Sequence, residues 1–153
     1  MADDACRHEV TIDRSPADAF DLFVHRFSAW WPQEFSWAQD ALDTMVLEPR
    51  AGGHLIERDK SRQETVWGQV LEIAPPDSLV FSWQISPDRE PLKSPEQASV
   101  VGVRFASDGA SRTRVILEHR MFARHGEGWQ SYLETMAAQG WPFALARYVA
   151  AAE

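Results

Sequence analysis

His119, Glu57 and Arg104 are the ionisable residues that predicted strands could place inside the fold. His119 ends a row that includes Val115 and Leu117 at a period of two, so its imidazole is expected to point inward. Burial favours the neutral form, and a lone inward histidine is more often a core or pocket-rim residue than a catalytic base. An inward Glu57 or Arg104 would need a partner, because burying a lone charge is costly; the alternative is that both face water.

Five large apolar side chains form a second set of candidates: Trp67, Phe81, Trp83, Met45 and Trp141. Flat aromatic rings and pliable thioethers accept varied apolar ligands, so these residues could line a pocket. The alternative is that each is an ordinary core residue, since aromatic residues at the period of a strand usually pack inside. Trp83 and Trp141 are the first choices for a pocket wall.

No motif in the sequence points to a nucleophile, a metal site or a cofactor. Cys6 is the single cysteine, and neither a CxxC nor an HExxH spacing occurs. The glycines at 52–53 and 126–128 lack the spacing of dinucleotide or phosphate loops and are predicted to lie in turns. We therefore predict no catalytic residues, no metal and no cofactor.

Length and charge narrow the class of protein. With 153 residues and 44% hydrophobic composition, the chain is expected to form one domain over residues 1–153. A net charge of −8 disfavours nucleic acid as a partner, because binding to phosphates relies on clustered Lys and Arg. The acidic N-terminus, the lone cysteine and the lack of an apolar run of roughly 18 residues predict a cytoplasmic protein without a membrane span.

Hydrophobic periodicity predicts an α+β order of elements. A first strand over 6–12 precedes a helix that starts at Ser15-Pro16 and ends near Ser28. A long helix is expected from Glu127 onward, with a kink or break around Gln139–Trp141 caused by Pro142. Six antiparallel strands lie between them, over 44–48, 54–59, 65–73, 79–86, 99–107 and 113–121.

Several motifs together resemble one known superfamily. They are Val10-Thr-Ile with Ser15-Pro-Ala-Asp-Ala-Phe20, Trp30-Trp31-Pro32, Glu48-Pro-Arg-Ala-Gly-Gly53 with Glu57-Arg58, Trp67-Gly68, Pro75-Pro76 running to Trp83, Glu118-His119 and Gly140-Trp141-Pro142. The chain is similar to the SRPBCC superfamily (START, polyketide cyclase and birch-pollen-allergen-like), and within it to the activator-of-heat-shock-ATPase-like branch. This resemblance covers almost the whole chain and implies a helix-grip fold, in which a curved antiparallel sheet of about seven strands wraps a long C-terminal α-helix.

The resemblance also gives Glu57 a place on the inner face, where it could pair with His119 or Arg104 or anchor a polar head group. We expect a small hydrophobic or amphipathic molecule to bind in a cavity between the sheet and the C-terminal helix. The predicted ligand-binding residues are Trp83, Trp141, His119, Trp67, Phe81, Met45, Glu57 and Arg104.

Two other functions remain open at this stage. One is a protein-interaction module that docks a chaperone, or self-associates, through an exposed apolar patch around Trp30, Trp31 and Phe35. Trp30 and Trp31 also have two simpler interpretations: a lip at the entrance of a cavity or, slightly favoured, a hydrophobic plug. The other function is a cyclase-like or hydrolytic enzyme that uses His119 and Glu57 as acid and base.

Overall fold

One seven-stranded antiparallel sheet forms the framework of the protein in the computed structural model, which describes residues 3–153. The strand order is β1-β7-β6-β5-β4-β3-β2, so each strand from β2 to β6 pairs with the next strand in the chain, and β1 pairs with the free edge of β7. The strands are β1 (Cys6–Ile12), β2 (Leu42–Leu47), β3 (His54–Asp59), β4 (Glu64–Ala74), β5 (Ser78–Trp83), β6 (Ser99–Ser107) and β7 (Thr113–Arg120). The predicted antiparallel meander is confirmed.

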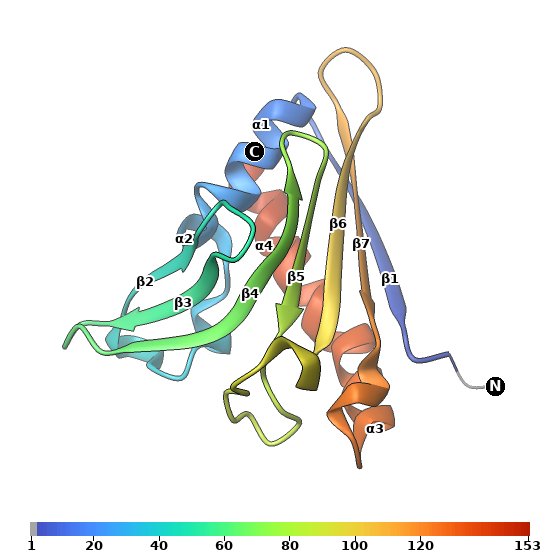
Figure 1. The fold of residues 1–153 in the computed structure, drawn as a ribbon. Coiled ribbons are helices and arrows are strands. Elements are labelled where there is room, and N and C mark those ends of the chain that lie inside the picture. Colours follow the sequence, from blue (N-terminus) through green and yellow to red (C-terminus); the bar gives the residue numbers. More distant parts are fainter. Residues whose placement is uncertain (1–2) are drawn as a thin grey trace.

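The helices lie on one side of this sheet, as Figure 1 shows. The α-helices are α1 (Pro16–Val24), α2 (Phe27–Trp30), α3 (Trp129–Thr135) and α4 (Trp141–Ala152), and a π-helical turn η5 (Met136–Gly140) joins α3 to α4. Short 3₁₀ turns are η1 (Gln33–Phe35), η2 (Gln39–Ala41), η3 (Pro95–Gln97) and η4 (Phe122–His125). The sheet curls around the C-terminal helix, which confirms the predicted α+β helix-grip fold. No helix within residues 3–153 combines the length and the apolar character needed to cross a membrane.

The first helical region is divided where the sequence predicts one helix. Ser15 caps α1 by accepting a hydrogen bond from the amide of Asp18 at 3.2 Å, and Pro16 occupies the first turn, as predicted. The carbonyl of Asp21 then accepts from the amides of both His25 and Arg26, at 2.9 and 3.1 Å. This shared acceptor interrupts the regular ladder, so α1 ends at Val24 and α2 starts as a separate turn.

The C-terminal helix changes its geometry at the predicted place without breaking. Pro142 has no amide hydrogen, so it cannot continue the regular i→i−4 ladder, and the π-helical turn η5 ends two residues before it. Gly140 packs closely here, because a Cβ atom at this position would lie 2.9 Å from the sulfur of Met136. α3, η5 and α4 therefore form one continuous helical arm.

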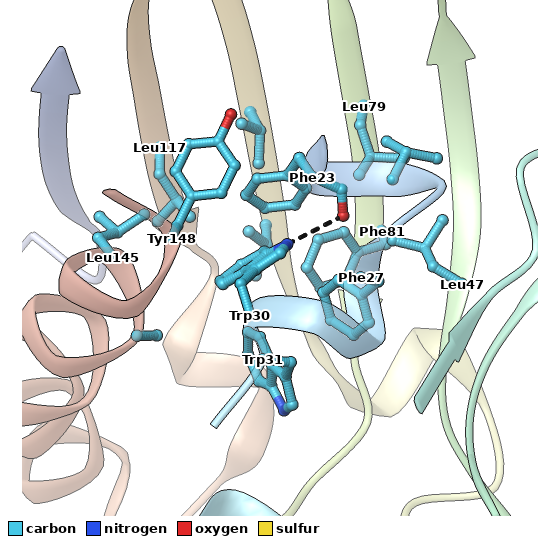
Figure 2. Close-up of a cluster of buried hydrophobic side chains, with 14 of the residues drawn as sticks. Phe23, Phe27, Trp30, Trp31, Leu47, Leu79, Phe81, Leu117, Leu145 and Tyr148 are labelled. Carbon is cyan, nitrogen blue, oxygen red and sulfur yellow. Dashed lines mark hydrogen bonds between the residues drawn. The ribbon is translucent and has the colours of Figure 1, made fainter. Parts of the chain in front are cut away.

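The aromatic core sits between the sheet and α4, as Figure 2 shows. Phe23 and Trp30 pack against Tyr148 of α4 with ring centroids 5.4 and 5.1 Å apart. The indole nitrogen of Trp30 donates to the carbonyl of Phe23 at 3.3 Å, and the hydroxyl of Tyr148 donates to the carbonyl of Ala19 at 2.7 Å. These contacts fill the end of the sheet that faces α1 and α2.

Candidate functional site

A cleft of about 540 Å³ lies at the other end of the helical arm. α3, η5 and the first turn of α4 form one wall, while η1 and the loop after β5 form the opposite wall. Figure 1 shows α3 and this loop at the same end of the sheet. The lining residues are Glu34, Phe35, Trp83, Pro87, Arg89, Gly128, Ser131, Tyr132, Thr135, Met136, Gln139, Gly140 and Phe143.

A hydrogen-bonded pair of aromatic residues belongs to the lining of this cleft. The indole nitrogen of Trp83 donates to the hydroxyl of Tyr132 at 2.6 Å, and that hydroxyl donates to the carbonyl of Ile85 at 2.8 Å. Burial raises the pKa of Tyr132 to about 12, so the phenol keeps its proton at neutral pH. The pair therefore offers a fixed aromatic surface whose own polar atoms already have partners.

The rest of the wall combines apolar rings with polar side chains. Phe35 and Phe143 lie with their centroids 5.5 Å apart, and Phe143 is 39% exposed. Glu34 forms a surface ion pair with Arg147, which lowers the pKa of the carboxyl mainly through its hydrogen bond. The guanidinium of Arg147 also lies 4.8 Å from the ring centre of Phe143. The cleft thus suits a molecule with a flat apolar body and a polar edge.

Beside the cleft, four tryptophans pack closely together, and we call Trp31, Trp67, Trp83 and Trp141 the indole cluster. Trp31 stacks on Trp67 at 5.4 Å and meets Trp141 edge-on at 6.0 Å. Trp83 lies 5.5 Å from both Trp67 and Trp141. The indole rings were expected to border an open hollow, but Trp31 from the end of α2 fills the space between them.

Trp31 is therefore a plug, and it contributes to no docking patch. Trp30 and Trp31 are only 3% and 7% exposed, because both pack into the core. Phe35 is half-buried and is the one member of the predicted patch that reaches the surface. The predicted exposed patch around these three residues is wrong.

A second, much smaller cavity adjoins the indole cluster. Its volume is about 10 Å³, which is the room of a single water molecule. It is lined by Trp31, Phe35, Trp37, Met45, Glu57, Trp67, Trp83, Ile85 and Arg89. We call it the inner cavity. Four of the predicted ligand-binding residues, Met45, Glu57, Trp67 and Trp83, thus meet around one space.

Glu57 lies inside, but it pairs with neither residue considered as its partner. Its side chain is buried, and its two oxygens accept the backbone amides of Trp37 and Ala38, both at 2.9 Å. Arg104 is exposed on the outer face of the sheet opposite Ser78. The predicted pairing of Glu57 with His119 or Arg104 is wrong, because backbone amides of an unpatterned segment satisfy the carboxylate instead.

His119 is fully buried in a row of hydrogen bonds. The indole nitrogen of Trp141 donates to Nδ1 of His119 at 2.9 Å, so Nε2 carries the imidazole hydrogen and donates to the hydroxyl of Ser99 at 2.7 Å. That hydroxyl in turn donates to Nε2 of His125 at 2.6 Å. Desolvation holds the pKa of His119 well below its usual value, so the ring is neutral. Its role here is to hold Trp141.

The predicted site residues thus fall into three groups. Trp83 lines both the cleft and the inner cavity, whereas Met45, Glu57 and Trp67 line only the inner cavity. Trp141, His119 and Phe81 are fully buried and line neither space. Arg104 lies on the outer face of the sheet.

The cleft wall on the helical arm was missed from the sequence. Ser131, Thr135 and Gln139 recur at a spacing of four, next to Tyr132 and Met136. Such a stripe places short polar side chains beside large apolar ones on one side of a helix. This mixed stripe is the signal that could have located the wall.

A curved antiparallel sheet that wraps a C-terminal helix, with a cleft beside that helix, defines the helix-grip class of proteins. The chain belongs to the family described as Activator of Hsp90 ATPase homolog 1-like protein, which matches residues 13–152. This places it in the SRPBCC superfamily and in the branch that the sequence motifs indicate. No curated protein matches the chain.

Several solved structures share the fold over nearly the whole chain. One is an anthrahydroquino-γ-pyrone synthase, Txn09, complexed with SUM: identity is 29%, the TM-score is 0.68 and 96% of each chain is covered. Another is CalC from Micromonospora echinospora, described as a self-sacrificing resistance protein, with 29% identity, a TM-score of 0.68 and coverage of 95% of this chain and 92% of CalC. Protein MLL2253 from Mesorhizobium loti, at 15% identity, a TM-score of 0.67 and coverage of 96% and 95%, shows the likeness of fold alone.

Proposed function

We propose that this protein binds a small hydrophobic or amphipathic molecule in the cleft between the helical arm, η1 and the loop after β5. The observation that carries the proposal is the cleft itself, about 540 Å³ in volume, with aromatic walls and polar side chains among them. Ligand sites commonly measure roughly 300–1,000 Å³ and combine apolar walls with a few polar groups. The cleft meets both conditions.

One relative supports a flat, oxygenated ring system as the class of ligand. Txn09, at 29% identity, is named for a product that contains anthrahydroquinone and pyrone units, and such fused rings are planar. In this chain, Trp83, Tyr132 and Phe143 offer aromatic surfaces to a planar body. Arg89, Ser131 and Gln139 offer hydrogen-bond donors to oxygen atoms on its edge.

The test is to fill the cleft and to measure binding of a fluorescent probe, 8-anilinonaphthalene-1-sulfonate. Thr135→Trp places an indole in the cleft, whereas Gln130→Trp adds the same ring on α3 outside the cleft lining. We expect saturable binding by the wild type, a loss of about tenfold or more in affinity for Thr135→Trp, and no change for Gln130→Trp. Absence of saturable binding by the wild type, or equal losses in the two variants, would overturn the proposal.

A further inference from the structure

The cleft and the inner cavity are neighbours, separated by side chains that they share. Phe35, Trp83 and Arg89 line both spaces. The side chain of Trp83 is held by its hydrogen bond to Tyr132, while the side chain of Phe35 makes only ring contacts, at 5.8 Å to Trp31 and 5.5 Å to Phe143. Phe35 is therefore the part of this partition that is free to move.

We propose that Phe35 is a movable partition, and that a neutral planar aromatic ligand displaces it so that the leading ring packs on the indole cluster with an oxygen at the indole N–H of Trp67. This inference rests on the proposed function, because the ligand enters through the cleft. The inference adds an inner subsite to the cleft. The residues of this subsite are those around the inner cavity, which has the volume of one water molecule.

The segment that carries Phe35 is fixed on both sides. In between, local hydrogen bonds hold the turn together, among them one from the hydroxyl of the buried Ser36 to the carbonyl of Gln33 at 2.7 Å, and the polar contacts with the rest of the protein lie at the surface. Trp31 is buried before it, and the buried carboxylate of Glu57 holds the amides of Trp37 and Ala38 after it. Between these points the outward contacts are the exposed ion pair of Glu34 with Arg147 and the hydrogen bond from the guanidinium of Arg89 to the carbonyl of Phe35. Exposed pairs of this kind contribute little to stability, so the 3₁₀ turn η1 can shift without disturbing the core.

The inner cavity has a donor that lacks a strong acceptor. The indole nitrogen of Trp67 points to the sulfur of Met45 at 3.3 Å, and a thioether is a weak acceptor. Two other indoles of the cluster have stronger acceptors, since Trp83 donates to a hydroxyl at 2.6 Å and Trp141 to an imidazole nitrogen at 2.9 Å. A carbonyl or phenolic oxygen of a ligand would give Trp67 an acceptor as strong as those of Trp83 and Trp141.

Charge selects which oxygen can reach this donor. The carboxylate of Glu57 lines the same cavity, and a second negative charge beside it would be repelled at short range in a poorly solvated space. A neutral ketone, quinone or phenol on the leading edge is therefore favoured over a carboxylate. Any anionic group of the ligand is expected to stay on the solvent side of Arg89, which lines both spaces and is exposed.

The test compares two probes of one shape, 2-acetylnaphthalene and 2-ethylnaphthalene, of which only the first carries a carbonyl oxygen. We expect the wild type to bind the ketone about fivefold to tenfold more tightly, and Trp67→Phe to remove this preference because the ring stays and the N–H is lost. The ratio of two affinities within one variant is unaffected by a change in its folding. A preference that survives in Trp67→Phe, or that is absent in the wild type, would overturn the inner subsite.

Two matched phenylalanine variants test the partition separately. Phe35→Ala should raise the affinity for 2-acetylnaphthalene about threefold or more, because no side chain needs to be displaced, whereas Phe143→Ala, which removes a ring of the cleft alone, should lower it. Equal losses of affinity for 2-acetylnaphthalene in Phe35→Ala and Phe143→Ala, with binding still blocked by Thr135→Trp, would show that the ligand stays in the cleft. This result would overturn the partition and leave the proposed function intact. No saturable binding of either probe to the wild type would overturn both proposals.

Discussion

The indole cluster and the cleft share Trp83, yet they are built in opposite ways. In the indole cluster, rings from α2, two strands and α4 interlock at 5.4 to 6.0 Å, and a row of hydrogen bonds through His119 fixes one of them. In the cleft, the facing rings of Phe35 and Phe143 are partly exposed, and the neighbouring residues Glu34 and Arg147 form one surface ion pair. The strongest aromatic signal in the sequence therefore marks the rigid support of the site, and the adaptable wall consists of less conspicuous residues.

Removing one ring from each region should expose this difference most clearly. Trp141→Ala should lower the free energy of unfolding by about 3–5 kcal/mol, because it leaves a large cavity and deprives His119 of its donor. Phe143→Ala, two residues along the same helix, should cost less than about 1.5 kcal/mol, since 39% of that residue is already exposed. Chemical denaturation of both variants checks this. Similar losses would show that the cleft wall is as tightly packed as the indole cluster.

Loss of the Glu57 carboxylate, which anchors the segment that carries Phe35, gives the second largest expected effect. Glu57→Gln keeps one carbonyl oxygen and turns an NH₂ group toward a backbone amide, so one of the two N–H groups of Trp37 and Ala38 loses its acceptor. We expect a loss of about 1–3 kcal/mol in stability and faster hydrogen exchange at these two amides.

The matched control for this anchor is Glu64→Gln, which breaks an exposed pair with Arg58 on the neighbouring strand. It should leave the exchange rates of Trp37 and Ala38 unchanged. If Glu57→Gln also leaves those rates unchanged, the carboxylate does not anchor the segment that carries Phe35. The proposed partition would then have no fixed point on this side.

Acid should weaken the histidine row before it affects the cleft. Desolvation lowers the pKa of His125 from 6.5 to about 4, and it lowers the pKa of His119 and His8 in the same direction. The unfolded chain therefore binds protons that the folded chain does not, so this stability is complete above pH 6.5 and falls as the pH drops toward 4.

Denaturant titrations at pH 7, 6 and 5 would measure this decline. His54→Gln removes an exposed histidine beside Glu48 and should leave the decline in place. A stability that stays constant from pH 7 to pH 5 would contradict the assignment of neutral, desolvated imidazoles to this row.

The fold could be predicted because its signals are local. Ser15-Pro16 started the first helix where predicted, alternation marked the strands, and Pro142 located the irregular turn. The division between α1 and α2 was missed, because it depends on two amides that share the carbonyl of Asp21. This arrangement of backbone atoms cannot be predicted from the types of residue.

The site was only partly predictable, for a geometric reason. The π-helical turn η5 widens the helical arm, so residues at a strict spacing of four, Ser131, Thr135, Gln139 and Phe143, all line the cleft. In a regular α-helix of about 3.6 residues per turn, that spacing would drift away from one face. The inward position of Glu57 was expected from the family pattern, but its partners lie in the unpatterned segment at Trp37 and Ala38. Contacts made by the backbone atoms of irregular segments do not depend on the types of residue, so the sequence does not predict them.

The row from Trp141 through His119 and Ser99 to His125 has one more consequence. An indole can only donate, so every hydrogen in the row points the same way, and within residues 3–153 the buried Nδ1 of His125 at its far end has no protein partner. Both tautomers are fixed by donors that cannot become acceptors: the indole N–H of Trp141 at Nδ1 of His119, and the backbone amide of Ser99, which donates to Nε2 of His125 at 3.2 Å. The two rings should therefore give the nitrogen NMR signature of fixed, opposite tautomers, with Nε2–H on one ring and Nδ1–H on the other.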